Sequence, residues 1–193
     1  YLPSFEGYPE EQKLMHFVSQ IVEGTPLCQK TRIGRIIRAG ESNREMVEAL
    51  DPNTGMPQWK YDYPTVYRDD FGFDEGPRST PSISAGRVYT FGAEGILHCL
   101  DFVTGKKLWA VDTHQQFDVR KGFFGAACSP LVEGRLVLLN IGGAKPSGLV
   151  AFDRETGKVM WAVSRDEASY SSPVAATVGA VRTVFCFTRS GLI

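Results

Sequence analysis

The sequence Cys99-Leu100-Asp101-Phe102-Val103-Thr104-Gly105-Lys106-Lys107-Leu108-Trp109 is the middle one of three related copies. The others read Ala49-Leu50-Asp51-Pro52-Asn53-Thr54-Gly55-Met56-Pro57-Gln58-Trp59 and Ala151-Phe152-Asp153-Arg154-Glu155-Thr156-Gly157-Lys158-Val159-Met160-Trp161. Successive aspartates lie 50 and 52 residues apart, and all three tryptophans of the chain fall at one position of the repeat. A fixed pattern at a fixed period indicates a repeat architecture. The shared positions are Asp51, Gly55, Trp59, Asp101, Gly105, Trp109, Asp153, Gly157 and Trp161.

Each shared position has a physical reason. An aspartate followed three and four residues later by Thr-Gly predicts a tight hairpin, because the carboxylate accepts backbone N–H bonds and glycine takes positive φ. The tryptophan four residues beyond that glycine lies on the last strand of the unit, where its large ring can seal one sheet against the next.

A second element recurs between the copies. Ser79-Thr80-Pro81, Cys128-Ser129-Pro130 and Ser171-Ser172-Pro173 each precede a short apolar stretch, then a β-rich run, and then a glycine that opens another strand. Each full unit therefore reads as four short strands separated by turns. Four-stranded units of about 50 residues are typical of β-propeller blades. We expect an all-β arc of about three to four four-stranded blades with a short N-terminal helix.

The repeat resembles that of the pyrroloquinoline-quinone-like (PQQ-like) β-propeller family, which includes quinoprotein alcohol dehydrogenases and BamB. Residues 61–65, 70–78 and 120–130 are similar to the BamB-like repeat proteins of planctomycete-type bacteria. The resemblance covers roughly residues 31–193, with Met56-Pro57 as a departure from the usual Lys-x. It implies a ring of seven or eight blades, so we expect this chain to be a fragment whose remaining blades come from missing sequence or another chain.

Residues 1–30 lie outside the repeat. Pro9 and acidic residues precede apolar side chains at helical spacing, which predicts an amphipathic helix over about 9–22. Because its polar face lacks a basic stripe, a packing or capping segment is favoured over a membrane-surface helix. We expect two parts, 1–30 and 31–193.

Composition narrows the function classes. The chain has 193 residues, 42% of them hydrophobic and 22% charged, with a formal net charge of −1. That balance disfavours nucleic acid as a partner, and no stretch is long and apolar enough for a transmembrane helix. The four cysteines (28, 99, 128 and 186) form no Cys-x-x-Cys pair, and we expect free, mostly buried thiols, although a disulfide between distant cysteines stays open.

The longest predicted loops, about 61–78 and 110–128, lead into innermost strands and should gather at one face near the central channel. Arg78 could contact an anion or cofactor there, or pair with acids of its own loop. Asp69, Asp70, Asp74 and Glu75 offer oxygens for calcium or simply form a solvated loop.

For most other polar residues a structural role is favoured. Thr80, Ser129, Ser171 and Ser172 recur at one position, which favours hydroxyls bonded to backbone at the start of the inner strand. Of the histidines, His98 falls in a strand and His16 on the predicted helix, so His114 in the second long loop is the one to test. No Gly-x-Ser-x-Gly nucleophile motif occurs.

Two functions stay open. The leading hypothesis is a non-enzymatic binding scaffold with a protein or ligand partner, no catalytic residue, no metal and no cofactor. The alternative implied by the resemblance is part of a PQQ-dependent dehydrogenase oxidising alcohols or sugars, in which Arg78 and Phe124 would face PQQ, with calcium. The adjacent cysteine pair of those dehydrogenases does not occur here. The resemblance also implies a periplasmic or secreted location.

Overall fold

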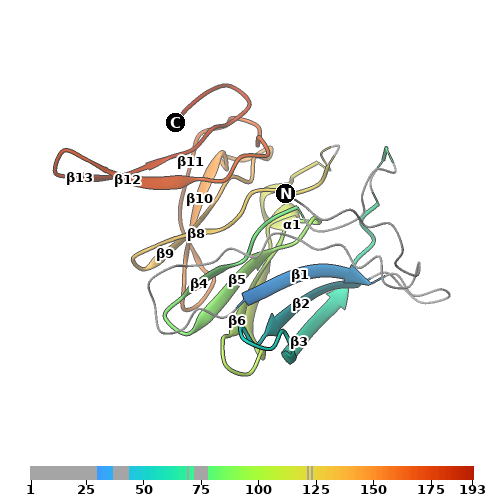
Figure 1. The fold of residues 1–193 in the computed structure, drawn as a ribbon. Helices are drawn as coiled ribbons and strands as arrows, with labels where there is room; N and C mark the ends of the chain where they lie inside the picture. The colour runs from blue at the N-terminus through green and yellow to red at the C-terminus, as the bar shows by residue number, and fades with distance from the viewer. Residues whose placement is uncertain (1–29, 37–43, 69, 72–77, 121, 123) are drawn as a thin grey trace, which may run out of the picture.

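The computed structural model describes residues 30–36, 44–68, 70–71, 78–120, 122 and 124–193. These residues form four antiparallel sheets arranged as successive blades (Figure 1). The first blade has β1 (Lys30–Ile36), β2 (Arg44–Leu50) and β3 (Pro57–Pro64), and the second β4 (Ser82–Ser84), β5 (Arg87–Phe91), β6 (Ile96–Asp101) and β7 (Lys107–Asp112). The third has β8 (Leu131–Glu133), β9 (Leu136–Leu139), β10 (Leu149–Asp153) and β11 (Val159–Val163), and the last β12 (Val174–Val178) and β13 (Val181–Phe185).

The sheets confirm the predicted all-β blades. The second and third are complete four-stranded meanders in which each strand pairs with its sequence neighbour. In the described part of the chain the only helix is α1 (Thr113–Phe117). The helix expected over 9–22 lies outside the described residues, so it and the boundary near residue 30 stay predictions.

The Asp-x-x-Thr-Gly turns have the predicted geometry. Asp101 Oδ1 accepts hydrogen bonds from the backbone N–H groups of Val103 (3.1 Å) and Thr104 (2.8 Å) and from Thr104 Oγ1 (2.7 Å). Gly105 closes the turn at φ +70°, a left-handed conformation that glycine adopts without strain. The first and third copies repeat these contacts, so the Met56-Pro57 departure leaves the turn intact.

Two of the three tryptophans seal neighbouring blades. Trp59 Nε1 donates to the carbonyl oxygen of Phe102 at 2.9 Å, and its ring covers Gly105 of the next hairpin. Trp109 repeats the arrangement one blade later, donating to the carbonyl of Arg154 at 3.2 Å. The third, Trp161, is 38% exposed.

The inner strands are joined by the recurring hydroxyl residues. The backbone N–H of Thr80 donates to Ser129 Oγ, and the N–H of Ser129 donates to Ser172 Oγ, each at 2.8 Å. Ser171 Oγ donates to the carbonyl of Phe187 at 2.9 Å. The hydroxyls of Ser129, Ser171 and Ser172 thus have the predicted structural role, and those of Ser129 and Ser172 tie the start of one inner strand to the next blade.

The largest apolar cluster lies between the second and third blades. Its fully buried members come from the middle strands of both sheets and include Tyr89, Phe91, Leu97, Val150 and Phe152. Strands β5, β6 and β10 are buried almost throughout, whereas the outer strands β7 and β11 contain both exposed and half-buried residues. The blades therefore form a rigid support for the loops at their ends.

Candidate functional site

The candidate site is a cleft of about 560 Å³ on the loop face, the side of the blades on which the loops after β9 and β11 lie. Strands β9 and β11 both pair antiparallel with β10, so they run in the same direction and end at the same edge of the sheet. The loops that follow them, together with the segment after β7 and Arg189 after β13, surround the cleft. It is lined by Asp70, His114, Asp118, Val119, Arg120, Gly122, Gly125, Ala126, Ala127, Asn140, Ile141, Gly142, Gly143, Ala144, Glu167, Ala168, Ser169, Tyr170 and Arg189.

Close backbone packing shapes the floor of the cleft. Gly142 has φ +58°, and a Cβ placed on it would lie 2.0 Å from the backbone nitrogen of Ala168. Its own N–H donates to the carbonyl of Ser147 at 2.7 Å. The loop after β9 therefore fits against the loop after β11 only with glycine at this position.

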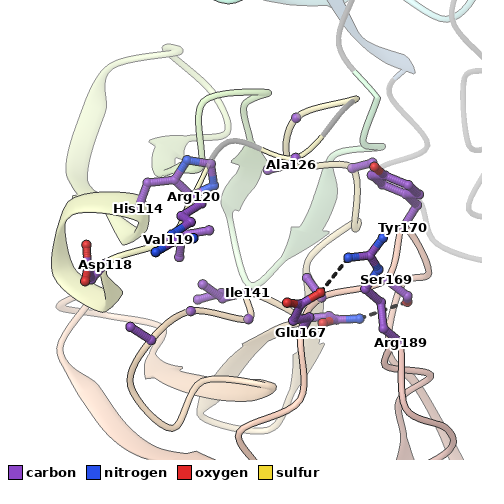
Figure 2. A pocket seen from close by; sticks show the side chains of 18 of the residues that line it. His114, Asp118, Val119, Arg120, Ala126, Ile141, Glu167, Ser169, Tyr170 and Arg189 are labelled. Carbon is purple, nitrogen blue, oxygen red and sulfur yellow. Dashed lines mark hydrogen bonds and ion pairs between the residues drawn. The ribbon is translucent and has the colours of Figure 1, made fainter.

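His114 forms one wall (Figure 2). It lies on α1, whose first turn is capped by Asp112 Oδ1 accepting from the N–H of Gln115 at 2.9 Å. The imidazole packs over Gly95, where a Cβ would approach it to 2.1 Å. Burial lowers the pKa of His114, so the ring is neutral near pH 7.

Asn140 connects two blades beneath the cleft. It is 3% exposed, and its Nδ2 donates to Ser169 Oγ at 3.1 Å and to the carbonyl of Phe187 at 2.8 Å. Sequence reasoning missed this residue. Its signal was a lone amide at the end of the apolar run Leu136–Leu139, directly before Ile141 and two glycines.

The opposite wall carries charge and an aromatic ring. Figure 2 shows Glu167 and Arg189 joined by an ion pair, which measures 2.5 Å, with Tyr170 beside them and His114 across the cleft. Both charged side chains are largely exposed, so the pair adds little to stability. Tyr170 is 47% exposed and its ring is accessible to a ligand.

The structure brings together the two residues predicted to face a cofactor. The guanidinium carbon of Arg78 lies 5.2 Å from the centroid of the Phe124 ring, within cation–π distance. Phe124 also contacts Phe71 at 5.7 Å and Tyr170 at 5.4 Å between centroids. Three successive interblade loops thus contribute one aromatic row at the rim of the cleft.

The acidic residues considered for calcium, and His16, lie partly outside the described residues. Asp70 lines the cleft, whereas Asp69, Asp74, Glu75 and His16 lie outside the described residues. Among the residues that the structure describes, no three His, Cys, Asp or Glu side chains gather as a metal site.

His98 and the cysteines are buried. His98 packs against Tyr63 with 4.2 Å between ring centroids, and desolvation lowers its pKa to about 4. Cys99, Cys128 and Cys186 are free thiols, as predicted, and burial raises the pKa of Cys128 to about 12. Cys28 lies outside the described residues. No helix in the described ranges is long and apolar enough to cross a membrane.

Comparison with known proteins gives one family match and several relatives. The family model described as outer membrane protein assembly factor BamB matches residues 43–193. The dehydrogenase subunit of the quinone alcohol dehydrogenase of Komagataeibacter europaeus is 33% identical over 147 residues, covering 72% of this chain and 19% of the relative. The same subunit from Gluconobacter oxydans (strain 621H) is 35% identical over 149 residues, covering 72% and 18%.

A solved structure has the same fold. The crystal structure of BamB from Moraxella catarrhalis superposes with a TM-score of 0.56 at 20% identity, covering 85% of this chain and 45% of that one. This likeness confirms the β-propeller architecture and carries no further meaning at that identity. The chain spans about a fifth of the length of the curated relatives that it matches.

Proposed function

The chain belongs to the family of the outer membrane protein assembly factor BamB, and from this premise we propose that it is part of a non-enzymatic propeller scaffold that binds a partner through its loop face. The cleft between the loops after β7, β9, β11 and β13 is the proposed binding site. Rigid blades hold these loops in place, which is the usual arrangement of a binding surface on a repeat scaffold.

The carboxylates of the described residues support binding over catalysis. General acid–base chemistry needs a titratable side chain, often a carboxyl group, that is placed to meet a substrate. Here Asp51, Asp101 and Asp153 hold hairpin turns, and Asp112 caps α1. Glu133, Glu155 and Glu167 are paired with arginines. These groups hold turns, a helix start or ion pairs. Asp70 and Asp118, which line the cleft beside Glu167, would contact a bound partner.

A quinone-dependent dehydrogenase is the second candidate. It is favoured by the position of Arg78 over Phe124, because a cation beside an exposed aromatic row fits a flat, anionic cofactor such as PQQ. The curated relatives are named as quinone alcohol dehydrogenases. In this case Arg78 would hold the anionic groups of PQQ and Phe124 would pack against its ring, while the quinone would supply the redox chemistry.

The proposed location is the periplasm or the outside of the cell. The family description names the outer membrane, and this supports a compartment in contact with it. A protein partner fits the same proposal, since an assembly factor acts on other proteins.

Titration with PQQ in the presence of calcium separates the two candidates. The measurements are absorbance and the shift of the melting temperature, because a ligand that binds only the folded state raises it. The scaffold proposal expects no saturation at high micromolar PQQ. Saturable binding that is weakened by Arg78→Ala would establish the dehydrogenase candidate instead.

Arg182→Ala is the matched control for that variant. Arg182 pairs with Glu133 at 2.7 Å and lies at the start of β13, at the opposite end of the strands from the cleft. A quinone signal that responds equally to both variants would reflect general loss of positive charge rather than a site at Arg78.

A further inference from the structure

We propose that the cleft binds a neutral, polyhydroxylated ligand, namely a short oligosaccharide. This inference rests on the proposed binding function and names its ligand class. It is drawn from the lining, the charge balance and the aromatic rim of the cleft.

The lining mixes polar side chains with small residues and contains few large apolar side chains. Val119 and Ile141 are the branched aliphatic residues among those that line the cleft, and the remainder are glycine, alanine or polar residues. The N–H groups of Gly125, Ala126, Gly142 and Ala144 already donate within the protein, so the hydrogen bonds offered to a ligand come mainly from the polar side chains of the lining. Such a surface favours a ligand that carries hydrogen-bonding groups on most of its edges over a lipid or an apolar peptide.

The charges of the lining nearly cancel. Asp118 and Glu167 oppose Arg120 and Arg189, and Asp70 adds one further carboxylate. A strongly anionic or cationic ligand would meet repulsion from one of these sets. Carboxylate, guanidinium and amide groups can instead accept from and donate to the hydroxyls of a neutral sugar.

The rim supplies exposed aromatic rings. Tyr170 is 47% exposed and meets Phe124 edge to face, while Phe71, which also contacts Phe124, is 54% exposed. A sugar ring has an apolar face of C–H groups between its hydroxylated edges, so it can stack on such a ring while its hydroxyls reach the polar lining. The cleft volume of about 560 Å³ lies within the range of small-molecule sites.

Calorimetric titration of the full chain tests the proposal without quinone or calcium. The neutral probes are maltotriose, cellotriose and triacetylchitotriose, and the anionic comparison is trigalacturonate. We expect at least one neutral probe to bind with a Kd of about 1 mM or tighter. Tyr170→Ala should weaken that binding about tenfold or more, whereas Tyr170→Phe, which keeps the ring, should change it by less than about threefold.

Trp161→Ala is the control, because Trp161 is an exposed aromatic outside the cleft lining. Its binding should equal that of the unmodified chain, and melting curves show whether each variant is folded. The proposal is overturned if no neutral probe saturates, if trigalacturonate binds best, or if Trp161→Ala abolishes binding and Tyr170→Ala does not. If the chain binds neither sugar nor quinone, only the proposed ligand class is refuted. If it binds quinone, the proposed scaffold function is refuted as well.

Discussion

Replacing Gly105 with alanine should destabilise the protein far more than the same change at Gly55. Both glycines have nearly equal positive φ, +70° and +72°, so each substitution costs about 1–2 kcal/mol for a left-handed conformation. At Gly55 a Cβ would meet nothing within 4 Å. At Gly105 the Cβ would lie 2.4 Å from Cε3 of Trp59, so the indole must move.

The extra cost follows from the role of that indole. Full loss of a buried tryptophan side chain costs about 3–5 kcal/mol, and a displaced ring keeps part of its contacts. We therefore expect Gly105→Ala to lose about 2–3 kcal/mol beyond Gly55→Ala, which corresponds to a melting temperature about 4–12 °C lower. Displacement of Trp59 should also lengthen its hydrogen bond to the Phe102 carbonyl, now 2.9 Å, and change its fluorescence.

The assay is urea unfolding of both variants and the parent, followed by circular dichroism and tryptophan emission. Equal free energies of unfolding for Gly55→Ala and Gly105→Ala, within about 0.5 kcal/mol, would refute the reasoning. The blades would then not be sealed through the contact between ring and hairpin.

Three further predictions concern stability. Trp109→Ala should cost about 3–5 kcal/mol and Trp161→Ala much less, because Trp161 is 38% exposed; equal losses in thermal melts would contradict the packing described. Hydrogen bonds from Arg135 and Thr156 lower the pKa of Asp153 to about 2, so the stabilisation from its ionised form is complete above pH 4 and is lost as the pH falls through 2. Asp153→Asn should therefore reduce the loss of stability at acid pH in unfolding experiments, and an unchanged pH dependence would contradict this role. Burial lowers the pKa of His98 from 6.5 to about 4, so the folded state prefers the neutral imidazole and the free energy of unfolding should fall as the pH drops from 6.5 to 4. His98→Phe should remove this pH dependence, and its persistence in the variant would disprove the assignment to His98.

Much of the fold was predictable because its signals are local and repeated. The Asp101 turn depends on residues within four positions of each other, so its sequence pattern specifies its hydrogen bonds directly. The role of Ser129 was also predictable, because a hydroxyl residue returns at the same place in each unit. Repetition thus revealed contacts between blades that no single copy indicates.

The cleft was less accessible to prediction. Arg78 and Phe124 were both singled out from the sequence, but their contact joins residues 46 positions apart in loops without periodicity. Asn140 was missed because its partners, Ser169 and Phe187, lie on other loops. His114 was expected in the second long loop, whereas it lies on a capped helical turn against Gly95.

The tryptophan contacts give the row of blades a direction. Each of the first two blades presents its indole to the following hairpin, as Trp59 does to Gly105 and Trp109 to Gly157. The blades thus pack head to tail: one side of a blade provides the tryptophan ring, and the other side provides the hairpin glycine that the preceding blade's ring covers. Duplication of a coding segment one repeat long would create a blade that already matches both neighbours, so such a protein can lengthen by copying without evolving a new interface.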